Sequence, residues 1–292
     1  MLAPEDALLL DRLTLSDRRV AVSPTAGGVR RARTRGAGIE FHEYRPYQVG
    51  DDPRAIDWTV EARLRQLVVR VSRGEGHLRL HAVIDTSASM GVGNPTKLAC
   101  ATRLAAALCY VAAEHRDAAG VSSFGETLRT SLPPAEGRGQ LFRALAVLEA
   151  LVPRGRSAID RSLEQYAAAA RGPGLVAVFS DYFEPGAGLR GLQYLLHRGL
   201  TPAVLQVVAP EEISPELDDQ TELVDVEAQD DPPLAVDAAV LAAYHRRMDE
   251  HEGRLREFCA AHGCAWIRLR SDMTFRQALS AMESSGIVGA SA

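Results

Sequence analysis

The stretch that most constrains the fold of this chain is residues 78 to 90, Leu-Arg-Leu-His-Ala-Val-Ile-Asp-Thr-Ser-Ala-Ser-Met. Its first half is apolar enough to form a strand buried within a sheet. The strand then ends on Asp85, Ser87 and Ser89, oxygen-bearing side chains at every second position. In an open α/β sheet, ligands bind at the carboxyl ends of the strands, so the pattern places oxygen donors at the binding edge. Mg²⁺ prefers such oxygens and retains several waters, so a few protein ligands are enough to hold it.

The rest of the chain alternates predicted strands and predicted helices. Strands are expected at 119–125, 174–179, 202–208 and 265–269, and helices at about 97–115, 139–151, 158–171, 187–198, 236–262 and 274–283. Shorter strands are expected near 127–132 and at 222–227. Because strands separated by helices form parallel βαβ crossovers, this order predicts an α/β fold with a doubly wound, mostly parallel sheet flanked by helices.

Three parts are expected along the chain. Residues 1–77 would hold an N-terminal helix at 4–15, an Arg/Gly-rich loop and a small β-rich segment. Residues 78–285 would form the α/β domain, and residues 286–292 a frayed tail. The Arg/Gly-rich loop at 18–38 is typical of a solvated connection, and a basic patch for an acidic partner or a phosphate is the alternative.

The composition is that of a soluble globular protein, with 46% hydrophobic and 24% charged residues. The net charge of -5 gives no general reason to expect binding to nucleic acid or to a membrane surface. No stretch approaches the roughly 18 apolar residues of a membrane span, and the N-terminus lacks a signal-peptide pattern. We therefore expect a cytoplasmic protein with reduced cysteines. Lys97 is the only lysine, and we attribute this preference for arginine to a GC-rich genome rather than to chemistry.

A second buried strand also ends on oxygen-bearing side chains, Ser180 and Asp181. Neighbouring parallel strands end at the same edge of a sheet, so Asp85 and Asp181 can converge. Ser157 precedes a predicted helix and can join them. The predicted ligands of a modest-affinity Mg²⁺ or Mn²⁺ site are therefore Asp85, Ser87, Ser89, Ser157 and Asp181. The alternative is that Asp85 and Ser157 only cap the helices that follow them.

These residues carry a family resemblance. The run Asp85-Thr-Ser-Ala-Ser-Met90 resembles the first motif of the metal-ion-dependent adhesion site in von Willebrand factor A-type domains, and Ser180-Asp181 resembles the third. The block at 38 to 63 is similar to the hallmark of a bacterial family called domain of unknown function 58. The matching residues are Gly38, Glu40, Phe41, Arg45, Tyr47, Gly50, Asp51, Asp52, Arg54, Ile56, Asp57, Trp58, Ala62 and Arg63, and the acidic strand at 223–227 also fits.

The resemblance covers roughly residues 30 to 283. It implies a von Willebrand factor A-like α/β domain preceded by a small β-rich segment. Members of the family are typically encoded beside MoxR-type AAA+ ATPases and are thought to act with them in chaperone-like or maturation work. In one departure, the second adhesion-site motif offers Thr, often followed by Asp, whereas this chain has Ser157 and Ala158. A serine hydroxyl can still bind a metal, so we expect a weaker site.

The leading hypothesis is a non-enzymatic protein-interaction module. Its metal would leave a coordination position open for a carboxylate of the partner, an AAA+ ATPase of the MoxR type or its client. One alternative is a metal-dependent hydrolase that uses the same carboxylates and needs a general base, for which His81 is poorly placed. Another is a metal-free scaffold that binds through the block at 38 to 63.

Two further patterns do not change this ranking. No phosphate-binding glycine loop, dinucleotide fingerprint or nucleophile elbow is present, so a partner would have to supply ATP hydrolysis. Cys259, His262 and Cys264 have a spacing reminiscent of zinc ligands, but the sequence places no fourth ligand nearby and we favour a structural role.

Overall fold

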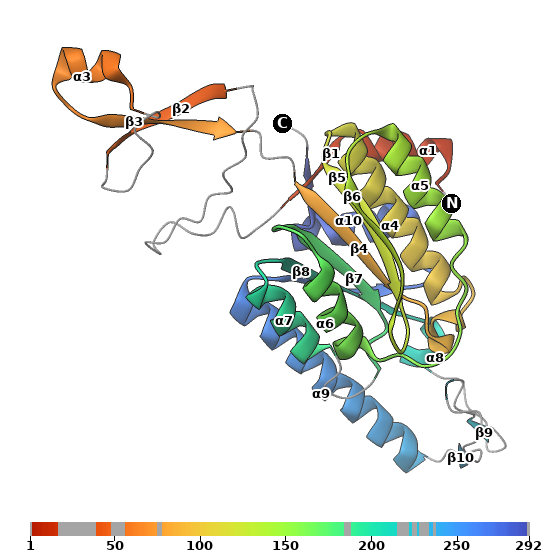
Figure 1. The fold of residues 1–292 in the computed structure, drawn as a ribbon. Coiled ribbons are helices and arrows are strands. Elements are labelled where there is room, and N and C mark those ends of the chain that lie inside the picture. The colour runs from red at the N-terminus through yellow and green to blue at the C-terminus, as the bar shows by residue number, and fades with distance from the viewer. Residues whose placement is uncertain are drawn as a thin grey trace. The chain divides into compact units, whose positions relative to one another are not determined.

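The computed structural model divides the chain into two compact units, residues 1–23 with 78–292, and residues 24–77. Figure 1 shows the ribbon. The described residues are 2–16, 39–47, 56–74, 78–183, 188–214, 222–223, 227, 234–235 and 238–290.

The larger unit is built on a six-stranded sheet with the strand order β11-β8-β7-β4-β5-β6. Its strands are β4 (Arg79–Asp85), β5 (Ala118–Phe124), β6 (Leu128–Ala135), β7 (Leu175–Ser180), β8 (Thr201–Val208) and β11 (Ala265–Arg270). Every neighbouring pair is parallel except β5 and β6, which are antiparallel. The prediction of a doubly wound, mostly parallel sheet flanked by helices is confirmed.

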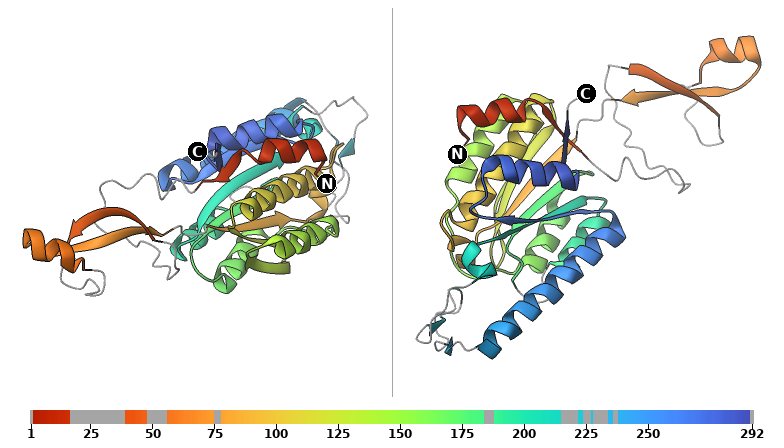
Figure 2. Two further views of the ribbon diagram at one scale, coloured as in Figure 1. Left: turned by 90° about the horizontal axis from the view of Figure 1, so that it is seen from above. Right: turned by 180° about the vertical axis from the view of Figure 1, so that it is seen from behind.

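The two faces of the sheet are both covered, and the sequence of each central strand explains why. In β4, Leu80, Ala82 and Ile84 point into one core and Val83 into the other. Because side chains alternate along a strand, a strand buried on both faces must be apolar at almost every position. One face is covered by α1 (Pro4–Leu10), α4 (Lys97–Glu114), α5 (Arg138–Glu149) and α10 (Phe275–Ser285), and the other by α6 (Ile159–Ala169), α7 (Leu189–His197) and α9 (Ala238–His262) (Figure 2).

The N-terminal residues belong to the α/β unit. The predicted division instead grouped them with the residues up to 77. Helix α1 ends at Leu10, and β1 (Leu13–Leu15) pairs antiparallel with β12 (Val288–Ala290) near the other end of the chain. Leu10 is 1% exposed and lies in the core beneath α4. The predicted frayed tail therefore contains a paired strand. Strands of three residues carry too little periodicity to be recognised in a sequence.

The edge strand β6 continues through Pro133 and Pro134, beyond the expected end of this strand near residue 132. An edge strand tolerates proline because the missing N–H can face away from the ladder. The register with β5 shifts around Gly120. A Cβ at Gly120 would lie only 2.6 Å from the carbonyl oxygen of Leu132, so the close approach of β6 requires glycine there.

The smaller unit contains an antiparallel pair, β2 (Ile39–Pro46) and β3 (Val68–Gly74), as the predicted β-rich segment requires. A helix that was not predicted, α3 (Trp58–Leu64), lies between them in the chain. Asp57 caps it by accepting hydrogen bonds from the backbone N–H groups of Thr59 and Val60, at 3.0 and 3.3 Å. The acid of the Asp-Trp pair thus has a local structural role.

The acidic, proline-rich segment after β8 begins with a short helix, α8 (Pro210–Ile213). Farther on, β9 (Glu222–Leu223) pairs with β10 (Leu234–Ala235), so only the start of the predicted strand at 222–227 lies in a described strand. Among the described helices, none has the length and apolar content of a membrane span.

The packing of α1 against the core predicts that two leucines of this helix differ in their contribution to stability. Leu10→Ala should lower the free energy of unfolding by roughly 2–4 kcal/mol, because it leaves a cavity in the core. Leu8 lies on the same helix but is 71% exposed, so Leu8→Ala should change stability by about 0.5 kcal/mol or less. Urea denaturation measures both. Equal, small effects would show that α1 does not belong to the α/β unit.

Candidate functional site

Strands β4 and β7 are neighbours at the point where the chain changes direction across the sheet (Figure 1). From β4 the chain continues to β5 and β6 on one side, whereas β7, β8 and β11 lie on the other. Ile84 pairs with Phe179, so the two strands end side by side, at Asp85 and at Ser180. Ligand sites of open α/β sheets occur at such a switch point.

The carboxylate of Asp85 is fully buried and accepts three hydrogen bonds. One oxygen accepts from the hydroxyls of Ser157 and Ser180, each at 2.8 Å. The other accepts from the backbone N–H of Ser87 at 2.9 Å, and the Ser87 and Ser89 hydroxyls lie 3.1 Å apart. Of the predicted ligands, Ser157 thus contacts the Asp85 carboxylate through its hydroxyl and Ser87 through its backbone N–H, and Ser89 lies beside Ser87. The structure also adds Ser180, whose position at the end of a strand was noted in the sequence but whose contact with Asp85 was not predicted.

The helix-capping alternative is wrong for both residues. The N-cap of α4 is Thr96, whose hydroxyl accepts from the N–H of Ala99 at 3.1 Å. The N-cap of α6 is Ala158, which has no side-chain cap. The Ser157 hydroxyl is used instead to hold Asp85.

An arginine ties together the two loops that carry the serines. The guanidinium of Arg129 donates to the carbonyl oxygen of Thr86 at 2.8 Å, to its hydroxyl at 2.9 Å, and to the carbonyl oxygen of Arg154 at 2.8 Å. Backbone bonds from Arg154 N–H to Thr86 and from Ala88 N–H to Gly155, at 2.9 and 2.7 Å, join the same loops. Arg129 is therefore a positioning residue for the site.

The acidic strand noted in the sequence also reaches this loop. A carboxylate oxygen of Glu227 accepts from the backbone N–H of Ser157 at 3.2 Å, and its carbonyl oxygen accepts from Arg156 at 3.2 Å. Glu227 thus adds a half-buried carboxylate beside Ser157. The other residues from 224 to 230 lie outside the described part of the chain.

The fifth predicted ligand, Asp181, is held by a lysine. The ammonium of Lys97 lies 2.7 Å from one carboxylate oxygen of Asp181 and 2.5 Å from Glu212, on α8. The Lys97 side chain is 0% exposed. Sequence reasoning missed Lys97 and Glu212. The available signal was that the single lysine of the chain follows the Asp-x-Ser-x-Ser loop, but it was attributed to genome composition.

Burial and charge repulsion both act on Asp85. Burial, and then the negative charge of Asp181, raise the pKa of Asp85 from 3.8 to about 6, against the opposing effect of hydrogen bonds from Ser87, Ser180 and Ser157. Burial also raises the pKa of Glu212, while Lys97 lowers it. Among the described residues, no cationic side chain forms an ion pair with Asp85. The carboxylate at the centre of the site is therefore electrostatically uncompensated.

His81, the only base considered for a hydrolase, is inside the protein and away from the end of β4. It is 2% exposed and its imidazole contacts the hydroxyl of Tyr166. Burial, and then the charge of Arg79, lower its pKa to about 4. His81 is thus a neutral core residue at ordinary pH and does not reach Asp85.

The Cys-His-Cys pattern lies at the end of α9 and in the turn that follows it. Cys259 is buried, the His262 ring contacts the carbonyl oxygen of Phe258 at 2.8 Å, and the Cys264 thiol lies 3.7 Å from the carbonyl oxygen of His262. Within the described ranges, no three Cys, His, Asp or Glu residues are arranged to hold a metal. A metal site at Asp85 would therefore need serine hydroxyls among its ligands.

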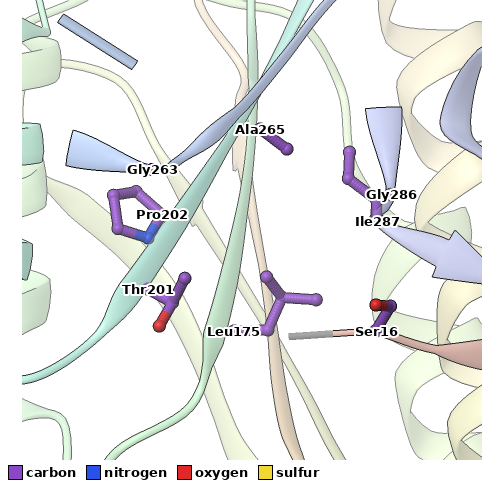
Figure 3. Close-up of a pocket in the computed structure, with 8 residues that line it drawn as sticks. All are labelled: Ser16, Leu175, Thr201, Pro202, Gly263, Ala265, Gly286 and Ile287. Carbon is purple, nitrogen blue, oxygen red and sulfur yellow. The ribbon is translucent and has the colours of Figure 1, made fainter. Parts of the chain in front are cut away.

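One small hollow, about 10 Å³ in volume, lies at the opposite edge of the sheet (Figure 3). Leu175, Thr201 and Ala265, the first residues of β7, β8 and β11, line it. This volume is about that of one water molecule. The hollow is too small for a ligand and lies at the wrong end of the strands to belong to the site around Asp85.

Comparison with known proteins places this chain in a family. The family model described as "Protein of unknown function DUF58" matches residues 43–254. A protein of Mycobacterium bovis, Uncharacterized protein Mb1516, is 29% identical over 225 residues, which cover 72% of this chain and 70% of the relative. Uncharacterized protein Rv1480 of Mycobacterium tuberculosis matches to the same extent.

Two solved structures are similar. The conserved hypothetical protein BatB from Bacteroides thetaiotaomicron is 18% identical, with a TM-score of 0.48 over 72% of this chain and 98% of that one. The SpRpn10 VWA domain is 12% identical, with a TM-score of 0.40 over 74% of this chain and 99% of that one.

The raised pKa of Asp85 predicts that a neutral substitute stabilises the metal-free protein. In the presence of EDTA at pH 8, Asp85→Asn should be more stable than the wild type by up to about 3 kcal/mol, because about two pKa units separate the folded and unfolded carboxyl. An amide can replace the same hydrogen bonds, since serine hydroxyls also accept.

The pH dependence gives the sign of this effect. A carboxyl whose pKa is raised on folding favours the folded state when protonated. The difference in the free energy of unfolding between Asp85→Asn and the wild type should therefore shrink as pH falls from about 6 toward 4. The opposite contribution of His81 is present in both proteins and cancels. Urea titrations at several pH values measure the gap, and a gap that is independent of pH would contradict the account.

The role of Arg129 in holding the two loops predicts that its removal lowers the stability of the protein. Arg129→Met should lower the free energy of unfolding by roughly 1–3 kcal/mol, because three carbonyl or hydroxyl oxygens lose a charged donor. Arg190→Met is the matched control, since Arg190 is 73% exposed in its ion pair with Glu164 and should change stability by about 0.5 kcal/mol or less. Thermal unfolding of both variants decides the point. Equal effects would mean that Arg129 does not hold the loops.

Proposed function

The chain belongs to the family described as Protein of unknown function DUF58, and we propose that it is a non-enzymatic protein-interaction module that contacts its partner through a divalent cation, Mg²⁺ or Mn²⁺. The observation that carries the proposal is the Asp85 carboxylate. It is fully buried at the switch point of the sheet, it accepts hydrogen bonds from the hydroxyls of Ser157 and Ser180, and no described cation forms an ion pair with it.

Charge balance supports a divalent cation. Asp85, Asp181 and Glu212 are three largely buried carboxylates, and the only ammonium ion among them is that of Lys97. With these four side chains ionised, two negative charges remain, and the half-buried carboxylate of Glu227 beside Ser157 adds to them. Because an uncompensated buried charge is costly, binding of a doubly charged cation would stabilise the site.

The donor atoms also fit such a cation. The Ser157 hydroxyl contacts the Asp85 carboxylate, and the Ser87 and Ser89 hydroxyls lie 3.1 Å apart on the loop that follows Asp85. Mg²⁺ and Mn²⁺ prefer such oxygen donors. These residues would hold the metal. Asp181 is paired with Lys97 and would take part by exchanging that contact for the metal. The metal, when bound, supplies a positive charge with coordination positions left for water or for a partner.

The surroundings favour binding over catalysis. A hydrolase would need a general base near the metal, and His81 is buried in the core beside Tyr166. At the ends of β4 and β7 the Ser157 and Ser180 hydroxyls donate to the fully buried Asp85 carboxylate, and within the described part of the chain no histidine forms a hydrogen bond with either serine. We therefore assign no catalytic residue.

We propose that the partner is an AAA+ ATPase of the MoxR type or its client. Family membership supports this choice, because members are typically encoded beside such ATPases. The partner would place an acidic side chain on the open position of the metal. The described helices include no membrane span, and the four cysteines are free thiols. We propose a cytoplasmic location for the complex.

A metal-dependent contact predicts that chelation and Asp85→Asn have the same effect. With the MoxR-type ATPase of the same organism as bait, the wild type should be retained in Mg²⁺ and lost in EDTA, and Asp85→Asn should be lost in both. Asp249→Ala, a change of an exposed acid on α9, should behave as the wild type. Retention that is indifferent to EDTA and to Asp85→Asn would overturn the metal-dependent interaction.

A metal-free version of the module is supported by one observation, the ion pair between Lys97 and Asp181. In this version Lys97 takes over part of the charge compensation, and the contact is made elsewhere on the protein. Titration calorimetry of the wild type with Mg²⁺ and with Mn²⁺ separates the two versions. Heat of binding supports the metal-dependent form, and its absence with both ions supports the metal-free form.

A further inference from the structure

Lys97 is placed where a lysine is least expected. It is the first residue of the 18-residue helix α4, and no acid lies in the first turn of that helix. The N-terminus of a helix carries a partial positive charge, which disfavours a cation. The side chain is also fully buried, although lysine is almost never fully buried without a partner. Such a violation of local preferences points to a functional requirement.

The partners of Lys97 show what this requirement is. Its ammonium lies between two carboxylates, 2.7 Å from Asp181 and 2.5 Å from Glu212, and 4.5 Å from the centre of the Phe183 ring. Asp181 directly follows Ser180, which binds Asp85. The ammonium is therefore joined to the proposed metal site through Asp181.

Glu212 is built to keep the ammonium when Asp181 does not. Its second carboxylate oxygen accepts from the backbone N–H of Ala209 at 2.7 Å, which fixes the side chain at the start of α8. The carbonyl oxygen of Glu212 accepts from the Tyr244 hydroxyl of α9 at 2.9 Å. Lys97 can thus lose its contact with Asp181 and still have a charged partner held in place.

We propose that the ammonium of Lys97 competes with the divalent metal for the carboxylate of Asp181. When the metal binds Asp181, the ammonium remains paired with Glu212. The inference rests on the proposed metal site. In the metal-free protein the ammonium neutralises Asp181 and keeps the fold stable. In the metal-bound protein it pairs with Glu212 alone, so Lys97 sets the metal affinity low. Metal binding is thereby linked to α8 and, through Tyr244, to α9.

Two variants should move the metal affinity in opposite directions. Lys97→Met removes the competitor, so Mn²⁺ and Mg²⁺ should bind roughly tenfold more tightly or better. Glu212→Gln removes the alternative partner, so the ammonium stays on Asp181 and both ions should bind at least about threefold more weakly. Arg103→Met is the control for charge, because it removes a cation from the same helix, 41% exposed and paired with Asp6, and should bind as the wild type.

Bound Mn²⁺ is counted by electron paramagnetic resonance on the full chain, and the melting temperature is measured with and without Mg²⁺. Lys97→Met should melt lower than the wild type in EDTA and gain more from Mg²⁺ than the wild type does. Unchanged or weaker binding by folded Lys97→Met would overturn the inference. If Lys97→Met does not fold, Glu212→Gln decides, and wild-type or tighter binding by that variant is the overturning result.

The two proposals fail in different ways. If the wild type binds Mn²⁺ and Lys97→Met binds it no more tightly, the metal site stands and the role of Lys97 does not. If neither the wild type nor Lys97→Met binds Mn²⁺ or Mg²⁺, the metal-dependent function fails together with the competition.

Discussion

The site depends on the burial of one carboxylate between two parallel strands. Asp85 ends β4 in the interior, and three hydrogen bonds from Ser87, Ser157 and Ser180 hold it there. Each bond comes from a different segment. Asp85 therefore fixes the loop that follows β4, the loop before α6 and the end of β7 relative to one another. These hydrogen bonds lower the cost of burying the carboxylate but do not neutralise it. A buried negative charge without a paired cation therefore remains at the carboxyl edge of the sheet.

The balance of charge at this edge of the sheet connects the fold to the proposed function. Two adjacent parallel strands that both end on acids bring like charges together, and the pKa of Asp85 is raised first by burial and then by this repulsion. The chain supplies one ammonium, from Lys97, and places it on Asp181 and Glu212 rather than on Asp85. A cation from solution can supply the remaining charge. We therefore propose that the shortage of cations beside these carboxylates lets the site bind a metal and present it to another protein.

The sequence was sufficient for features that follow from strand periodicity. A buried strand ending on Asp85 and a second ending on Ser180 predicted neighbouring parallel strands and a shared edge, and the structure has both. The contact of Ser157 with Asp85 followed from the same reasoning and from the family resemblance. These predictions succeed because an apolar run of strand length, flanked by helices, has few alternative placements.

Features that depend on long-range packing could not be predicted. The pairing of β1 with β12 joins residues 275 positions apart through three residues on each side, and neither strand has a local signal. The ion pair of Lys97 with Asp181 spans 84 positions and requires the start of α4 to face the end of β7. Only the unusual occurrence of a single lysine at a helix N-terminus pointed to it. Residues that break a local rule are thus informative even when their partners are unknown.

The central claim is that a divalent cation binds at the carboxyl edge between β4 and β7. Anomalous diffraction from crystals grown with Mn²⁺ tests it most directly. The account predicts one anomalous peak beside the hydroxyls of Ser87, Ser89 and Ser157. A map without a peak at this edge, from crystals in saturating Mn²⁺, would contradict it.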